Sequence, residues 1–103
     1  MAKTSFSFHR RGYDGASSTQ SHIVVDGSEV TEDLTPGASN TQTTATAPAL
    51  GGKTACRVTT DTTCYVAFGA NPNAASGTKR FLLLANTSEV FFVNPGDKGA
   101  CAT

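Results

Sequence analysis

The chain has 103 residues, of which 38% are hydrophobic and 16% are charged, and this length favours a single domain. Eight basic and eight acidic side chains give a formal net charge of zero, which argues against a non-specific nucleic-acid binder because such proteins carry a basic stripe. No apolar run approaches the length of a membrane span, and no signal peptide opens the chain. We therefore expect a cytoplasmic chain with reduced thiols that binds neither nucleic acid nor membrane.

The first twenty residues are expected to form an arm. Residues 4–9 alternate polar and apolar side chains, the period-two pattern of a strand, with Phe6 and Phe8 on one face. The segment that follows has almost nothing to bury. We predict an arm over residues 1–20, which pairs with the sheet edge of a neighbouring molecule, and a β domain over residues 21–103. The alternative, in which both phenylalanines fold back onto the chain's own sheet, stays open.

The arm also supplies the side chains that we expect to anchor the protein to a partner. The candidate residues combine aromatic rings with a basic pair, and they are Phe6, Phe8, Arg10, Arg11 and Tyr13. Two adjacent arginines make too small a basic spot for a nucleic-acid site and favour a docking contact. Deleting residues 1–20 is then expected to abolish partner binding while the domain stays folded.

The middle of the chain predicts one hairpin and a long polar stretch. Residues 22–25 form a short strand, and Asp26-Gly27 is a strong turn signal, so residues 28–31 are expected to pair with that strand. In the Thr- and Ala-rich stretch that follows, residues 43–46 form either an edge strand or part of an exposed loop.

The second half contains the clearest strand signals. Residues 56–60 and 63–68 are rich in β-branched and aromatic residues, and only Asp61-Thr62 separates them, so we expect a hairpin. Residues 81–84 form an apolar run that is expected to be a strand buried on both faces. Two further strands are expected at residues 90–93 and 99–102, joined by a type II turn at residues 94–97.

Together these segments predict an all-β protein. The fold we expect is a small antiparallel β-sandwich, jelly-roll or immunoglobulin-like, of about seven or eight strands with an extended N-terminal arm.

No group of residues has the pattern of a catalytic, cofactor-binding or metal-binding site. His9 and His22 have no second ligand at metal spacing, and the cysteines show no closely spaced pair. Residues 47–54 match a relaxed phosphate-binding loop, but a strand follows them where that loop needs a helix. We therefore predict that the protein is not an enzyme and holds no cofactor or metal.

The cysteines, Cys56, Cys64 and Cys101, are odd in number and do not form a disulfide framework. In some registers of the expected hairpin Cys56 and Cys64 would lie near each other, so a bond between them stays open. The favoured interpretation is that all three are small core or edge residues.

Residues 56–72 and 81–98 resemble a module common in small structural proteins of tailed bacteriophages. The shared pattern is R-V-T-x-D-x-x-C-Y-V-x-F-G-x-N-P, a variable loop, and L-L-x-A-x-x-x-E-x-F-x-V-x-P-G-D-K, and it covers about residues 55–102. The resemblance implies a small antiparallel β-sandwich in the virion that decorates and stabilises the capsid. Its partners would be the major capsid protein and copies of itself.

One departure and one alternative accompany this resemblance. Residues 99–103 are less apolar than the family's closing strand, so this strand is expected to be weak or to pair between subunits. The alternative function is a neck- or tail-associated module that binds a carbohydrate receptor through the loop at Asn71-Pro72-Asn73 and through Tyr65. Phe91 and Phe92 would extend this site if they shared an exposed face with Tyr65, although aromatic residues in strands are more often core.

Overall fold

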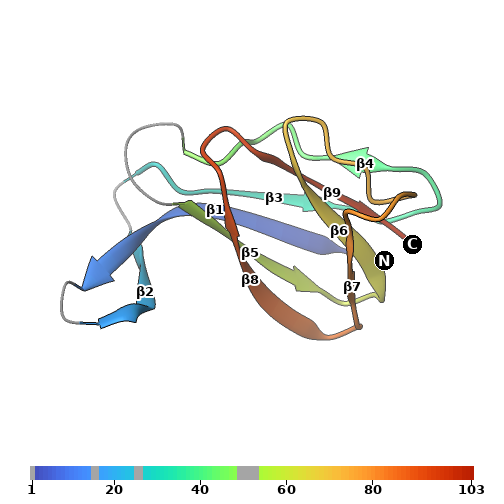
Figure 1. Ribbon diagram of the computed structural model, residues 1–103. Coiled ribbons are helices and arrows are strands. Elements are labelled where there is room, and N and C mark those ends of the chain that lie inside the picture. The colour runs from blue at the N-terminus through green and yellow to red at the C-terminus, as the bar shows by residue number, and fades with distance from the viewer. Residues whose placement is uncertain (1, 15–16, 25–26, 49–53) are drawn as a thin grey trace.

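The computed structural model describes residues 2–14, 17–24, 27–48 and 54–103, and these residues form two antiparallel sheets without a helix (Figure 1). The strands are β1 Thr4–Asp14, β2 Ser17–Val24, β3 Val30–Leu34, β4 Thr41–Gln42, β5 Thr54–Thr60, β6 Cys64–Gly69, β7 Phe81–Leu83, β8 Thr87–Val93 and β9 Lys98–Ala102. Side chains from both sheets meet in one core, so the predicted small antiparallel β-sandwich is confirmed.

The five-stranded sheet is organised around β1. Its order is β2-β1-β5-β8, and β3 also pairs with β1. β3 pairs with the N-terminal half of β1 and β2 with the C-terminal half, so the two strands share one side of β1 in succession. The hairpin predicted across Asp26 and Gly27 is therefore wrong, because the strands on either side of it pair with β1 rather than with each other. Asp26 itself lies outside the described residues.

The first strand belongs to the domain. Residues Thr4 to Arg10 pair with β5 along one side, and Phe6 and Phe8 point into the core with 0% exposure. Of the two alternatives for these phenylalanines, the structure has the one in which they fold back onto the chain's own sheet. Deleting residues 1–20 would remove the central strand of this sheet, so the domain is not expected to fold without them.

The four-stranded sheet has the order β4-β9-β6-β7. β5 and β6 lie in different sheets, so the hairpin predicted across Asp61-Thr62 is wrong, and residues 61–63 connect the sheets instead. The closing strand β9 lies between β4 and β6, and Ala100, Cys101 and Ala102 are all fully buried. The closing strand therefore pairs within its own chain.

The exposed edges of the two sheets differ from the prediction. β7 is the last strand of its sheet, and Phe81, Leu82 and Leu84 are 56%, 54% and 61% exposed. The prediction of a strand buried on both faces over residues 81–84 is wrong. An edge strand has a neighbouring strand on one side only, so its side chains are less covered than those of a central strand. Only Leu83 of this run is buried.

Candidate docking surfaces

The described part of the chain offers little chemistry. It contains no group of three or more His, Cys, Asp or Glu side chains that could hold a metal ion. His9 is buried, with Nδ1 3.0 Å from the carbonyl oxygen of Arg10, and the side chain of His22 lies outside the described structure. Residues 49–53 of the phosphate-loop match also lie outside it, and the strand β5 begins at Thr54.

The three cysteines are free and buried. Cys56 and Cys64 come from different sheets rather than from one hairpin. Burial raises the pKa of the Cys56 thiol far above its usual range. Burial, with a contribution from Cys64, raises the pKa of the Cys101 thiol to about 12. Because the thiolate is the nucleophile, these cysteines fit the structural role that the sequence favours.

No helix long and apolar enough to cross a membrane occurs in the described ranges.

A two-stranded ribbon, residues 11–14 of β1 with β2, leaves the five-stranded sheet. Arg10 is the last residue of β1 that pairs with β5, opposite Thr54, and it also pairs with Val24. From Arg11 to Asp14, β1 pairs only with β2 in the described structure, and the last pair is Asp14 with Ser17. Figure 1 shows this ribbon extending beyond the sandwich. The whole molecule, ribbon included, measures 42 Å along its longest axis and 26 and 25 Å along the others.

The structure places the five candidate anchor residues in the core, at the root of the ribbon and on the ribbon itself. Phe6 and Phe8 are core residues and reach no surface. Arg10 lies half-buried at the root of the ribbon. Arg11 and Tyr13 lie on the ribbon backbone, and their side chains are outside what the structure describes.

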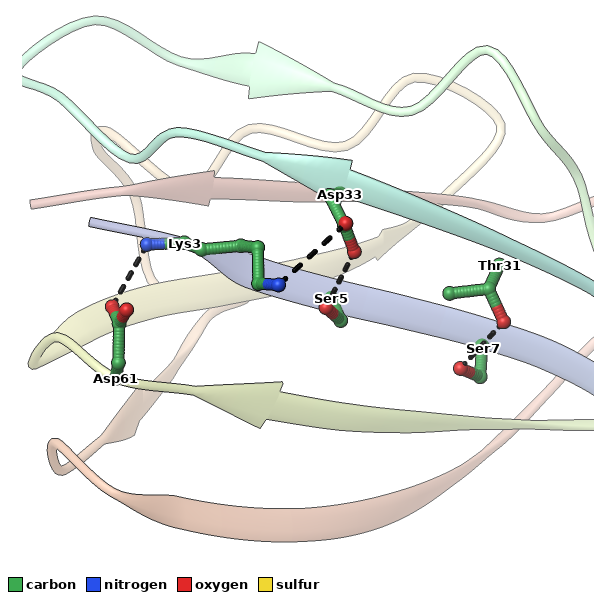
Figure 2. A network of polar contacts seen from close by, with 6 residues as sticks. All are labelled: Lys3, Ser5, Ser7, Thr31, Asp33 and Asp61. Carbon is green, nitrogen blue, oxygen red and sulfur yellow. Dashed lines mark hydrogen bonds and ion pairs between the residues drawn. The ribbon is translucent and has the colours of Figure 1, made fainter. Parts of the chain in front are cut away.

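Around β1 and β3, the outer face of the five-stranded sheet is polar, and its side chains bind one another. The amide of Lys3 donates to Asp61 Oδ1 at 2.8 Å, and the hydroxyl of Ser5 donates to Asp33. The Lys3 to Asp33 ion pair is long at 3.9 Å, and both side chains are more than half exposed, so it contributes little stability. Figure 2 shows the network, which is formed by Lys3, Ser5, Ser7, Thr31, Asp33 and Asp61. This face ties β1 to β3 and to the turn after β5.

An apolar edge lies where β7 and β8 end their sheets. We use this name for five large side chains that are 53% to 64% exposed: Phe81, Leu82, Leu84, Val90 and Phe92. The rings of Phe81 and Phe91 lie 5.3 Å apart between centroids and join the edges of the two sheets. A groove of about 430 Å³ opens there, and the rings of Phe68, Phe81, Phe91 and Phe92 line it. Sequence reasoning missed this surface because it assigned residues 81–84 to the interior.

The loop of residues 70–80 covers the outer face of the four-stranded sheet. Ala74 is fully buried and packs with Ala67, Ala100 and Ala102. Small side chains on β9 therefore let the loop lie close to the sheet, which explains why the closing strand is less apolar than the resemblance implies.

The residues of the carbohydrate alternative do not share a face. The guanidinium carbon of Arg80 lies 3.8 Å from the ring centroid of Tyr65, so Arg80 covers one face of this ring. Phe91 packs against the core, whereas Phe92 lies on the outer face of the other sheet beside Val90. A groove of about 440 Å³ does lie at the loop, lined by residues that include 71–73.

Comparisons with known proteins find no matching family model, no matching curated protein and no matching solved structure.

Proposed function

We propose that the protein is a structural subunit of a tailed-bacteriophage virion, which decorates the head by binding the lattice of the major capsid protein. The motif resemblance supports the choice of a virion protein. The observation that carries a docking role is the ribbon, which continues two strands of the sheet beyond the sandwich.

The ribbon is suited to binding a partner for a physical reason. An isolated pair of strands is marginally stable in water, because it has no second layer on which to bury its side chains. Beyond Arg10 the described pairing of β1 involves only β2. Packing against a capsid subunit would supply a second layer. The edge of β2 away from β1, which has no strand partner among the described residues, would add main-chain hydrogen bonds to a capsid strand.

The proposed mechanism is burial and strand addition rather than catalysis. A standard interface buries roughly 800 Å² on each partner. One such contact adds only a modest stabilisation to the capsid. When each copy links neighbouring capsid subunits and the contact is repeated over the whole shell, the summed mechanical stabilisation is large. The protein would be made in the host cytoplasm and then reside on the capsid surface.

Cosedimentation with empty heads prepared without this protein tests the proposal. The test variant replaces residues 12–22 by Asn-Gly, because Arg11 and Ile23 are directly paired and a two-residue turn closes such a pair. Thr31→Lys, exposed on the outer face of the same sheet, is the matched control.

We expect the natural protein and Thr31→Lys to pellet with heads at a fixed ratio to the capsid protein, and the shortened variant to stay in solution. Unchanged binding of the shortened variant would show that the ribbon is not the anchor. If the natural protein binds isolated tails and not heads, the decoration role is wrong and the receptor-binding alternative replaces it.

A further inference from the structure

The edge strand β8 has only one of the features that normally protect the edge of a sheet, the charged side chain of Glu89, which lies opposite the core residue Val58. Natural edge strands are shielded by charged side chains, prolines, bulges or short length, because their free main-chain groups pair readily with another strand. β8 runs for seven residues from Thr87 to Val93, contains no proline and no basic residue, and pairs with β5 without a register shift. In the described structure its other side has no strand partner. Such an edge is open to strand addition.

We propose that the apolar edge binds a second copy of this chain, with β8 pairing antiparallel to β8 of that copy about a two-fold axis at Val90. The inference goes beyond the proposed capsid role and is independent of it, because it concerns the purified protein alone.

The sequence of β8 is compatible with itself in this register. Val90 at the middle of the strand would lie opposite its own copy, and Phe92 would lie opposite Ser88 of the second copy. The one charged residue of the strand, Glu89, would lie opposite Phe91 of the second copy, so no like charges face each other. The formal net charge of zero also keeps repulsion between two copies weak.

The two-fold axis also brings the second sheet into the contact. An antiparallel pairing of one edge with itself requires an axis perpendicular to the sheet, so both sandwiches lie on the same side of the joined sheet. β7 is the edge strand of the four-stranded sheet. It lies on the same side of the molecule as β8, because the rings of Phe81 and Phe91 are in contact. Phe81 would then approach the second copy on this side. Val90 and Phe92 lie on the outer face of the joined sheet, where they would pack against Val90 and Ser88 of the second copy.

Phe92 adds apolar area to a contact made by the backbone of β8. An aromatic side chain presents roughly 150–250 Å², and Phe92 is 64% exposed. A standard interface buries about 800 Å² on each partner, so the backbone of β8 with its polar neighbours would supply most of this area.

Sedimentation equilibrium of the purified chain tests whether the edge is used. We expect the mass to approach twice 10.6 kDa at high concentration and to fall on dilution. Val90→Lys places a charge at the centre of the proposed contact, and because Val90 is 53% exposed the fold should tolerate it. We expect this variant to stay at the monomer mass, whereas Thr31→Lys, on an exposed position of β3, should dimerise like the natural chain.

Oxidative cross-linking tests the register. Val90→Cys would face its own copy at about 4.5–5.5 Å between Cα atoms, within the range of a disulfide. Ser88→Cys is the matched control, because the same register separates the two copies of residue 88 by four residues, or about 13 Å. The native cysteines are buried and should not compete.

A cross-linked dimer of Val90→Cys and none of Ser88→Cys is the expected result. Equal cross-linking of both variants, or a dimer that survives Val90→Lys, would overturn the proposed contact. A natural chain that is monomeric at all concentrations would also overturn it. If Val90→Lys then failed to bind heads, the apolar edge would be a capsid contact instead, and the proposed function would stand without this inference.

Discussion

At the scale of single residues, the contact between Gly99 and Phe6 joins the two sheets. Gly99 lies on β9 opposite the ring of Phe6, which is fully buried. A β-carbon at residue 99 would lie 2.5 Å from Cδ2 and 2.7 Å from Cε2 of that ring. The ring has no free space into which to move, so the glycine is required by packing and not by backbone conformation.

Gly99→Ala is therefore expected to lower the free energy of unfolding by about 1–3 kcal/mol, the usual range for overpacking a core. Gly37→Ala is the matched control, since no atom lies within 4 Å of its added β-carbon, and this variant should change stability by less than about 1 kcal/mol. Urea denaturation measures both. Equal stability of the two variants would show that the sheets are less closely packed at this point.

Burial of Cys101 predicts a loss of stability at high pH. Its pKa in the folded protein is raised to about 12, above a value of about 8.5 expected in the unfolded chain. The folded state therefore holds the thiol proton more tightly. The resulting stability is complete below about pH 8.5 and declines as the pH rises towards 12, by at most about 1.4 kcal/mol per pH unit.

The difference in unfolding free energy between the natural chain and Cys101→Ala isolates this contribution from other titrating groups. We expect the advantage of the natural chain to be constant from pH 7 to about 8.5 and to shrink at pH 10. A difference that does not change with pH would mean that the thiol is accessible to water.

At the scale of elements, the two edges of the sandwich are closed in different ways. Glu32 on β3 accepts hydrogen bonds from the amides of Thr44 at 3.0 Å and Ala45 at 2.9 Å, and from the Thr44 hydroxyl at 3.1 Å. This carboxylate binds the segment after β4 to the other sheet. The opposite edge, at β7 and β8, has exposed apolar side chains. The turn between these strands is held by backbone amides, since Ala85 donates to Thr63 Oγ1 at 3.0 Å and Asn86 donates to the carbonyl oxygen of Thr60 at 2.9 Å. The second edge is therefore the one that we expect to bind another molecule.

Glu32→Gln should lower the free energy of unfolding by about 1 kcal/mol at neutral pH, because a neutral amide accepts these bonds less strongly. Partial burial raises the pKa of Glu32, but the bonds from Ala45 and Thr44 outweigh it and hold the pKa below its usual range. The stability due to the carboxylate is therefore present above about pH 4.5 and is lost as the pH falls through the lowered pKa. Urea denaturation at pH 7 and pH 3 should show the natural chain losing its advantage at the lower pH. An equal advantage at both values would contradict the clamp.

The loop over the four-stranded sheet depends on Arg80. Nη1 of Arg80 donates to the carbonyl oxygens of Ala74 at 3.2 Å and Ala75 at 3.3 Å, while the guanidinium stacks on Tyr65. A lysine has no planar group for this combination of stacking and bonding. Arg80→Lys should speed hydrogen exchange at the amide of Ala74 by about tenfold and leave the amides of β5 unchanged. A uniform change across both sheets would instead indicate a global loss of stability.

Strand positions were more predictable from the sequence than strand partners. Period-two alternation is local, and it places β6 and β9 within one residue of their observed bounds. Pairing depends on contacts between distant segments, so the short link at Asp61-Thr62 favoured a hairpin where the chain passes between sheets. The apolar run at residues 81–84 was assigned to the interior because a strand at an edge and a strand in the middle of a sheet have the same local pattern. The alternation at residues 4–9 predicted a strand, but it left open whether Phe6 and Phe8 pack in the chain's own core.

At the scale of the whole molecule, the ribbon and the apolar edge have different proposed tasks. The ribbon is formed by β1 and β2, whereas the apolar edge is formed at β7 and β8. Binding to the head and pairing of two copies should therefore be separable by mutation. Pairing should also strengthen head binding, because a dimer offers two ribbons to the lattice.

The most direct measurement is a binding isotherm on empty heads for the natural chain, the shortened-ribbon variant and Val90→Lys. We expect the shortened variant to be dimeric and not to bind, and Val90→Lys to be monomeric and to bind at least about tenfold more weakly than the natural chain. Undiminished binding by the shortened variant, or failure of the natural chain to bind heads at all, would contradict the central claim that this protein is a capsid-docking subunit anchored by its ribbon.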